Sequence, residues 1–260
     1  MTADRTSRPR PAAAATAVGV ALAVAAGLLL TSGCSLLPGD RKTAVTDAEV
    51  TAAVTAVDLR DTGSGDITVT PGDGPGVAVH RTIRYRGGEV PTTGQRVAGG
   101  VLTFGDGDCD GDCSIDYELR VPASATVKLR SSSGDITVTG VAAADLHADS
   151  GDVRADRIAG ALKVRTSSGD IAGTALAGPD ADAQSSSGDA RLEFTAAPRS
   201  VSANTSSGDV TLRLPGGPYR VDTRTDSGDR EVSVPTDPAA EPRLTVKTSS
   251  GDVRIGPRGV

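Results

Sequence analysis

Closely spaced carboxylates mark one segment whose residue types and spacing could bind a metal. Four aspartates alternate with other residues in it: Asp106, Asp108, Asp110 and Asp112. Oxygen ligands at every second position, with Gly111 sixth, match the start of a calcium-binding EF-hand loop. Tyr117 stands at the twelfth position, where such a loop carries a bidentate glutamate. We therefore favour a solvated acidic turn here and keep Ca²⁺ as the alternative.

A second set of carboxylates recurs along the chain in the tripeptide Ser-Gly-Asp, which occurs eight times. Its aspartates are Asp66, Asp135, Asp152, Asp170, Asp189, Asp209, Asp229 and Asp252. Stacked carboxylates repel one another, by about 1 kcal/mol per pair in water at such spacings. Turn chemistry explains Ser, Gly and Asp together, because Asp and Ser bond to nearby amides and Gly tolerates unusual backbone angles. We therefore predict structural turns, with a Ca²⁺ ladder as the alternative.

Basic residues accompany these aspartates. Arg154, Arg191 and Arg254 each follow a repeat aspartate by two positions, which places them on the same strand face. A second polar column lies three residues before the Ser and reads Arg130, His147, Arg165, Gln184, Asn204, Arg224 and Lys247.

Catalytic chemistry has little support in the sequence. The two histidines, His80 and His147, fall at polar positions of β-like segments, and the many serines belong to the repeat. No nucleophile has a base at a recognisable motif spacing. We therefore predict that the protein is not an enzyme. We expect no cofactor, and Ca²⁺ is the one alternative.

Alternating apolar positions around each Ser-Gly-Asp predict the elements that carry these residues. In the unit of Asp170, for example, Leu162, Val164 and Ile171 occupy one side of two short strands that flank the turn. The spacing of about 20 residues is typical of stacked repeats. Residues 127–258 are therefore predicted to form an all-β, single-stranded solenoid, wound right-handed, of about seven to eight rungs. Arg230 interrupts the inner column, which we interpret as a local slip of register.

Residues 49–126 are less regular and are predicted to form an N-terminal β segment. The unit of Asp66 resembles the others, although the strand before it, with Val57 and Leu59, is one residue out of register. The β-like runs that follow are expected to start the solenoid and to add a hairpin that caps its open end.

At these residues a resemblance to a known family becomes visible. The units Ser132-Ser133-Gly134-Asp135-Ile136-Thr137-Val138 and Ser206-Ser207-Gly208-Asp209-Val210 are similar to those of a bacterial family whose members are named "putative adhesin". The segment from Cys113 to Pro122 resembles actinobacterial members. The resemblance covers nearly all of the exported chain and implies a β-helix-like domain, often on lipoproteins or membrane-anchored proteins. It implies no catalytic motif.

The N-terminus predicts export. A basic start and an apolar run from Ala12 to Leu30 end in small residues, as in a secretory signal peptide, here residues 1–33. Leu30-Thr31-Ser32-Gly33-Cys34 resembles a lipobox with Thr31 in the usual leucine position, so Cys34 is the expected lipidation site. An uncleaved membrane anchor and ordinary cleaved secretion are the alternatives. Residues 34–48 are expected to form a tether. The protein would then be extracytoplasmic, where Cys109 and Cys113 are expected to form a disulfide.

The charge balance bears on the partner. Without the signal peptide, which holds three arginines and one aspartate, 24 basic residues face 32 acidic ones. This excess argues against nucleic acid. The leading hypothesis is an envelope-binding or adhesin-like module that binds a cell-envelope glycan or protein and meets the membrane through its lipid anchor. The alternative is a structural or regulatory envelope accessory protein that associates with a membrane protein.

Overall fold

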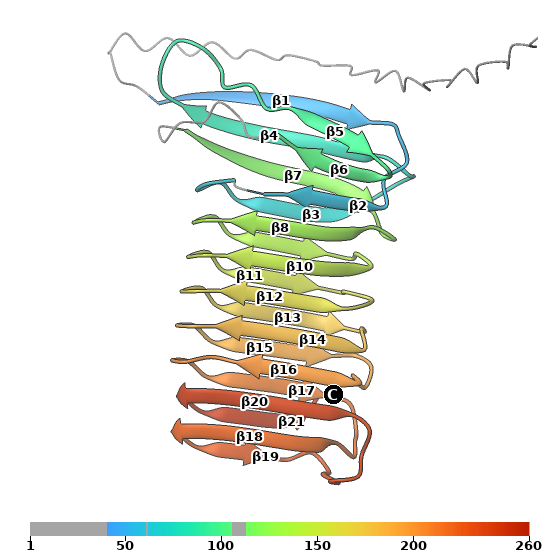
Figure 1. The fold of residues 1–260 in the computed structure, drawn as a ribbon, viewed down its shortest axis with the longest axis vertical. Coiled ribbons are helices and arrows are strands. Elements are labelled where there is room, and N and C mark those ends of the chain that lie inside the picture. The colour runs from blue at the N-terminus through green and yellow to red at the C-terminus, as the bar shows by residue number, and fades with distance from the viewer. Residues whose placement is uncertain (1–40, 61, 106–112, 260) are drawn as a thin grey trace, which may run out of the picture.

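The structure is a computed structural model and describes residues 41–60, 62–105 and 113–259. These residues form 21 strands and no helix. The strands build two sheets that face each other along an elongated stack (Figure 1). The predicted all-β class is therefore confirmed. In the part of the chain that is described, nothing helical has the length and apolarity that crossing a membrane requires.

The first sheet, here sheet A, has eleven strands. In spatial order they are β1 (Lys42–Val50), β4 (Val77–Tyr85), β7 (Ser114–Pro122), β3 (Ile67–Gly72), β9 (Ile136–Thr139), β11 (Val153–Asp156), β13 (Ile171–Leu176), β15 (Ala190–Phe194), β17 (Val210–Leu214), β21 (Val253–Pro257) and β19 (Arg230–Val232).

The second sheet, sheet B, has ten strands. In spatial order they are β18 (Arg220–Ser227), β20 (Arg243–Ser250), β16 (Ser200–Asn204), β14 (Asp180–Ser185), β12 (Leu162–Thr166), β10 (Ala143–Ala148), β8 (Thr126–Ser131), β2 (Ala56–Leu59), β6 (Val101–Phe104) and β5 (Gln95–Ala98).

Each rung consists of one strand of sheet B, a Ser-Gly-Asp turn and one strand of sheet A. Parallel pairing keeps equivalent residues in register, so that Leu146, Val164 and Ala183 lie side by side in sheet B. In the inner rungs the apolar side chains of both strands point between the sheets and are buried there, whereas alternate residues such as Lys163 and Arg165 point outward. Stability therefore comes from contact between neighbouring rungs, as in other solenoids.

The C-terminal rungs do not follow sequence order. The last rung, β20 and β21, lies between the rung of Asp209 and the rung of Asp229, so β18 and β19 close the stack (Figure 1). Arg230 pairs in register with Val253 and is exposed. The predicted slip of register is thus wrong: Arg230 stands at an inner position of the outermost rung, which no further rung covers.

At the other end, antiparallel strands extend both sheets. In sheet A, β1 and β4 pair antiparallel, as do β4 and β7, and in sheet B the hairpin β5–β6 lies beside β2. Two expectations fail here. Val57 and Leu59 are in register with Val127 and Leu129, because the turn before Asp66 absorbs the extra residue. Residues 42–48, assigned to the tether, belong to β1, which pairs with β4 along its whole length.

Candidate binding surfaces

The repeat aspartates form a continuous ladder of hydrogen bonds along the edge of the stack. In seven of the eight rungs the aspartate Oδ1 accepts the backbone N–H of the aspartate in the next rung, at 2.8–3.0 Å. The ladder runs in spatial order Asp66, Asp135, Asp152, Asp170, Asp189, Asp209, Asp252 and Asp229. Asp116 of β7 extends it by accepting the N–H of Asp66 at 3.2 Å. Asp116 lies outside any Ser-Gly-Asp unit, so the repeat gave no signal for it.

Arginines two residues later screen this column of negative charge. Arg154 pairs with Asp152 at 2.9 Å and with Asp135 at 3.3 Å, and Arg254 pairs with Asp252 at 2.5 Å. Arg191 pairs with Asp189 at 2.5 Å. Each cation therefore offsets part of the repulsion between stacked carboxylates.

Glycine in the repeat allows the turns to stack closely. A Cβ on Gly134 would lie 2.0 Å from the Gly65 carbonyl oxygen, and one on Gly169 would lie 2.0 Å from that of Gly151. These distances are far below any van der Waals contact, so the need for glycine is steric.

A second ladder runs inside the turns through buried hydroxyls. Thr166 Oγ1 donates to the Gly151 carbonyl at 3.3 Å and accepts the N–H of Gly169 at 3.0 Å. The hydroxyls that donate to a glycine carbonyl of the neighbouring rung belong to Ser131, Thr166, Ser185, Thr205, Thr248 and Thr225. Ala148 occupies the equivalent place in the rung between those of Ser131 and Thr166 and carries no hydroxyl. Ser or Thr, Gly and Asp of the repeat thus bond rung to rung.

The cation hypotheses have no described site. Among residues 41–60, 62–105 and 113–259, no group of three or more His, Cys, Asp and Glu side chains is arranged to hold a metal ion. The acidic loop with Asp106, Asp108, Asp110 and Asp112 lies outside the described residues. Its calcium hypothesis therefore stays a prediction, as does the disulfide, because Cys109 lies in the same stretch.

The outward column of sheet B lines a polar groove, here defined by His147, Arg165, Gln184, Asn204, Ser167, Ser186 and Ser206. The groove has a volume of about 320 Å³ and follows the strand ends next to the turns. His147, Arg165, Gln184 and Asn204 lie opposite one another on successive strands. The Arg165 Nε donates to Gln184 Oε1 at 3.4 Å, and Asn204 Nδ2 donates to Ser202 Oγ at 2.9 Å. This arrangement offers amide, guanidinium and hydroxyl groups at rung spacing, about 4.8 Å apart.

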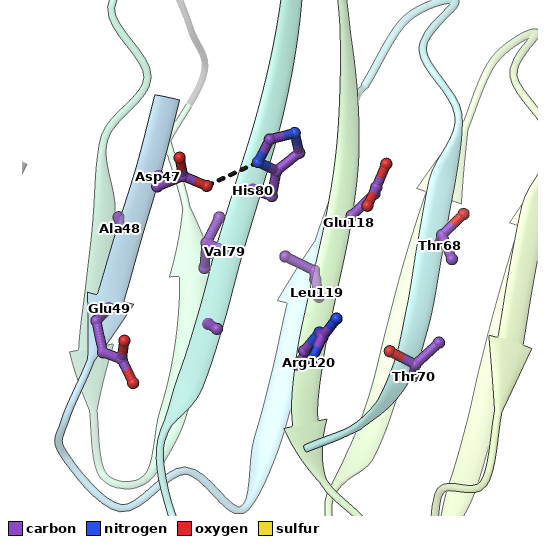
Figure 2. Close-up of a pocket in the computed structure, with 11 residues that line it drawn as sticks. Asp47, Ala48, Glu49, Thr68, Thr70, Val79, His80, Glu118, Leu119 and Arg120 are labelled. Carbon is purple, nitrogen blue, oxygen red and sulfur yellow. Dashed lines mark hydrogen bonds and ion pairs between the residues drawn. The ribbon is translucent and has the colours of Figure 1, made fainter. Parts of the chain in front are cut away.

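A larger groove, the cap groove, lies on the outer face of sheet A across β1, β4, β7 and β3 and has a volume of about 610 Å³ (Figure 2). Its polar lining consists of Asp47, Glu49, Thr68, Thr70, His80, Glu118 and Arg120. His80 Nδ1 lies 2.7 Å from Asp47 Oδ1, and Glu118 stands opposite His80 on the next strand. Three carboxylates against one arginine make the groove acidic. Asp47 was missed as a site residue because residues 42–48 were assigned to the tether. The alternation of outward Asp47 and Glu49 with buried Val50 could have predicted a strand here.

At this end of the stack, a buried arginine lies between the two sheets, next to two aromatic rings. The Arg81 guanidinium lies 5.5 Å from the Phe104 ring centre and 5.6 Å from that of Tyr117. Arg81 also donates to Gln95 Oε1. Burial lowers the pKa of Arg81 and raises that of Tyr117. This packing fixes the β4–β7 face that carries the cap groove.

Comparison with known proteins places the chain in a family. No curated protein matches it. Among solved structures, a "putative adhesin" from Bacteroides fragilis NCTC 9343 is 15% identical, with a TM-score of 0.48, over 84% of this chain and 98% of that chain. A "putative lipid binding protein" from Parabacteroides distasonis ATCC 8503 is 13% identical, with a TM-score of 0.45, over 83% and 97%. The family Toastrack DUF4097 matches residues 60–256, from the first repeat unit to the last strand. The chain therefore belongs to the Toastrack DUF4097 family.

Proposed function

We propose that this protein is an extracytoplasmic, lipid-anchored binding module that attaches to the cell envelope as an adhesin-like protein. Cys34 would carry the lipid, and residues 35–41 would link it to β1. The outer face of sheet B would bind the ligand.

The polar groove is the observation that carries this proposal. Its side chains repeat from rung to rung in register, which suits a ligand that itself repeats, such as an envelope glycan. The amides of Gln184 and Asn204, which now bond to Asp182 and Ser202, would exchange these partners for ligand hydroxyls. Arg165 and His147, which now lie near Asp182 and Asp149, would do the same with hydroxyl or acidic groups of a polymer. The hydroxyls of Ser131 and Ser185, those of the equivalent threonines, and the Oδ1 atoms of the repeat aspartates are bonded between rungs, so they hold the groove's spacing.

The test is a pull-down of isolated cell envelopes with purified residues 41–260. Envelopes are used with and without prior protease treatment, and binding that survives protease indicates a glycan or lipid ligand. A variant with Arg165→Ala, Gln184→Ala and Asn204→Ala should lose most of the binding. A matched variant with Thr137→Ala, Thr211→Ala and Arg213→Ala, outward on sheet A, should retain it. Equal binding by both variants would contradict a ligand site in the polar groove.

The second candidate, an accessory that associates with a membrane protein, is favoured by the cap groove. That groove lies at the end of the stack where the chain enters β1, and therefore nearest to the proposed anchor (Figure 1). Its acidic lining suits a basic segment of a partner protein. Binding that disappears after protease treatment and is weakened by Glu118→Gln would favour this candidate.

A further inference from the structure

The C-terminal end of the stack ends in an open rung. β18 and β19 are the outermost strands of sheets B and A, and a groove of about 490 Å³ opens beside them. Val221, Thr223 and Val232 line it together with Thr236 and Pro238 of the following loop. Val232 is 37% exposed and is the one exposed large hydrophobic residue among those the structure describes.

The backbone of this rung is available for pairing over a short, defined stretch. The Arg220 N–H donates to Pro242, on the side of β20, whereas the Tyr219 N–H donates to Pro235 in the loop on the opposite side. Because amides alternate along a strand, Val221, Thr223 and Thr225 turn their N–H and C=O groups to the open edge. In β19 the Ser233 N–H donates to Ile255 of β21. The backbone N–H and C=O of Val232, one residue earlier, therefore point to the open edge as well.

The outward side chains of β18 alternate in charge. They are Arg220, Asp222, Arg224 and Asp226. An antiparallel, two-fold pairing with a second β18, centred on Thr223, brings Asp222 opposite Arg224 of the second copy. The same register brings Arg220 opposite Asp226 of the second copy. Centring the pair on Asp222 or on Arg224 would instead bring like charges together. Centring it on Val221 or on Thr225 would match only one kind of opposite-charge pair, so charge favours the Thr223 register, which matches two.

Backbone geometry is compatible with the same register. Thr223, like Val221 and Thr225, faces the open edge, so two copies of Thr223 can exchange both backbone hydrogen bonds across the axis. The charged residues then occupy the alternate pairs, in which opposing side chains lie closest. The existing pair between Arg224 and Asp226, 3.2 Å apart, is highly exposed and therefore weak, so it offers little resistance to new partners.

The axis also passes by the exposed valine. Thr223 pairs with Val246 and Val232 pairs with Ile255, so both hold inner positions of the outermost rung, and both line the groove at this end. A two-fold axis perpendicular to both sheets through Thr223 therefore brings Val232 against Val232 of the second copy. Isologous contact of this kind is self-complementary and closed.

We propose that two copies of this chain pair end to end through β18 and β19, with their stacks continuing across a two-fold axis at Thr223 and Val232. The N-terminal strands β1 then lie at the two far ends of the joined stack (Figure 1). If the chain is lipid-anchored, a point that rests on the proposed function, the two anchors lie at opposite ends and the pair joins facing membranes. The pairing itself does not depend on the anchor or on the polar groove.

Charge exchange tests the register. The full chain, solubilised in detergent, is studied by light scattering over a range of concentrations. Arg224→Asp should weaken the dimer about tenfold, since two symmetry-related pairs become repulsive. Asp222→Arg should have the same effect. The double variant, Asp222→Arg with Arg224→Asp, should restore the dimer, because each residue again meets its opposite in the second copy. Thermal unfolding checks that the variants fold.

Cysteine cross-linking gives a second readout. Val232→Cys should form a covalent dimer under mild oxidation in membranes, above the background of the unmodified chain, while Ser202→Cys, outward in the middle of sheet B, should not. A chain that stays monomeric at every concentration would overturn the proposed pairing. The open edge would then be expected to pair with a strand of another protein. The proposed pairing would also be overturned by a dimer that both single charge variants leave unchanged, or by one that the double variant fails to restore. Loss of envelope binding with an intact dimer would contradict only the proposed function.

Discussion

Individual residues of the repeat bond to the rungs on both sides of their own. Asp170 shows this most clearly: no ion pair with it is described, its N–H donates to Asp152 Oδ1 at 3.0 Å, and its own Oδ1 accepts the Asp189 N–H at 2.8 Å. Removing the acceptor leaves that amide without its partner. We expect Asp170→Ala to lower the free energy of unfolding by about 1 kcal/mol in urea titrations.

The matched variant Asp170→Asn separates hydrogen bonding from charge. Asparagine keeps the Oδ1 acceptor and removes one of the stacked negative charges, so its stability should equal or slightly exceed that of the unmodified chain at low salt. A loss as large as that of Asp170→Ala would show that the carboxylate charge, rather than the acceptor, is needed.

Asp58 of sheet B provides a pH-dependent contribution. Hydrogen bonding from the Arg60 side chain lowers the pKa of Asp58 and outweighs burial, which raises it; Lys128 and Arg130 act in the same direction as Arg60. A carboxyl whose pKa is depressed by folding stabilises the fold above its unfolded pKa, about 3.9, and the contribution is lost as the pH falls through the folded value. Asp58→Asn should therefore be less stable than the unmodified chain at neutral pH by at most about 1 kcal/mol.

The difference between the two proteins should shrink as the pH falls below about 4 in urea unfolding. Asp73→Asn, in an exposed turn, controls for the loss of one negative charge elsewhere on the molecule. A stability difference for Asp58→Asn that persists unchanged at low pH would contradict the ion-pair explanation.

At the scale of strands and turns, the hydroxyl ladder has one gap that can be filled. Ala148 is fully buried between Ser131 and Thr166, and the equivalent hydroxyl of other rungs donates to a neighbouring glycine carbonyl. We expect Ala148→Ser to bond to the Gly134 carbonyl and to raise the unfolding free energy by about 0.5–1 kcal/mol. Ala183→Ser places the same hydroxyl in the apolar column between Val164 and Ala203 and should destabilise instead. Equal effects of the two substitutions would show that the ladder position offers no special acceptor.

Strand alternation and turn chemistry could be predicted from the sequence because they are local. Leu162, Val164 and Ile171 mark their inward faces without knowledge of any neighbour. The placement of β20 and β21 inside the stack could not be predicted, because all units share one register and any two can pair. Arg230 carried the only hint: an inner arginine suits a rung with one uncovered side. The cap groove likewise depends on which strands lie beside β4, and that follows from antiparallel pairing over long sequence separations.

At the scale of the whole molecule, each rung contacts only its two neighbours, so whole units should be exchangeable. Deleting Val153–Asp170 removes one repeat and joins Asp152 to Ile171, two positions that are equivalent in the stack. Ile136 can then pair with Ile171 as it does with Val153, and Ala144 with Ala181 as it does with Leu162. We expect this shortened chain to fold into the same two sheets, with a rod shorter by about 4.8 Å in small-angle scattering.

An out-of-phase deletion is the control for this prediction. Removing Val153–Ala161 joins Asp152 to Leu162 and so puts a strand of sheet B where a strand of sheet A must follow the turn. Every later rung would then lose its partner across the core, and far-UV circular dichroism should show loss of β structure or a much lower melting temperature. If both deletions folded equally well, stacking in register would not be the main source of stability. If neither folded, the rungs would have to be coupled over longer distances than nearest-neighbour contact provides.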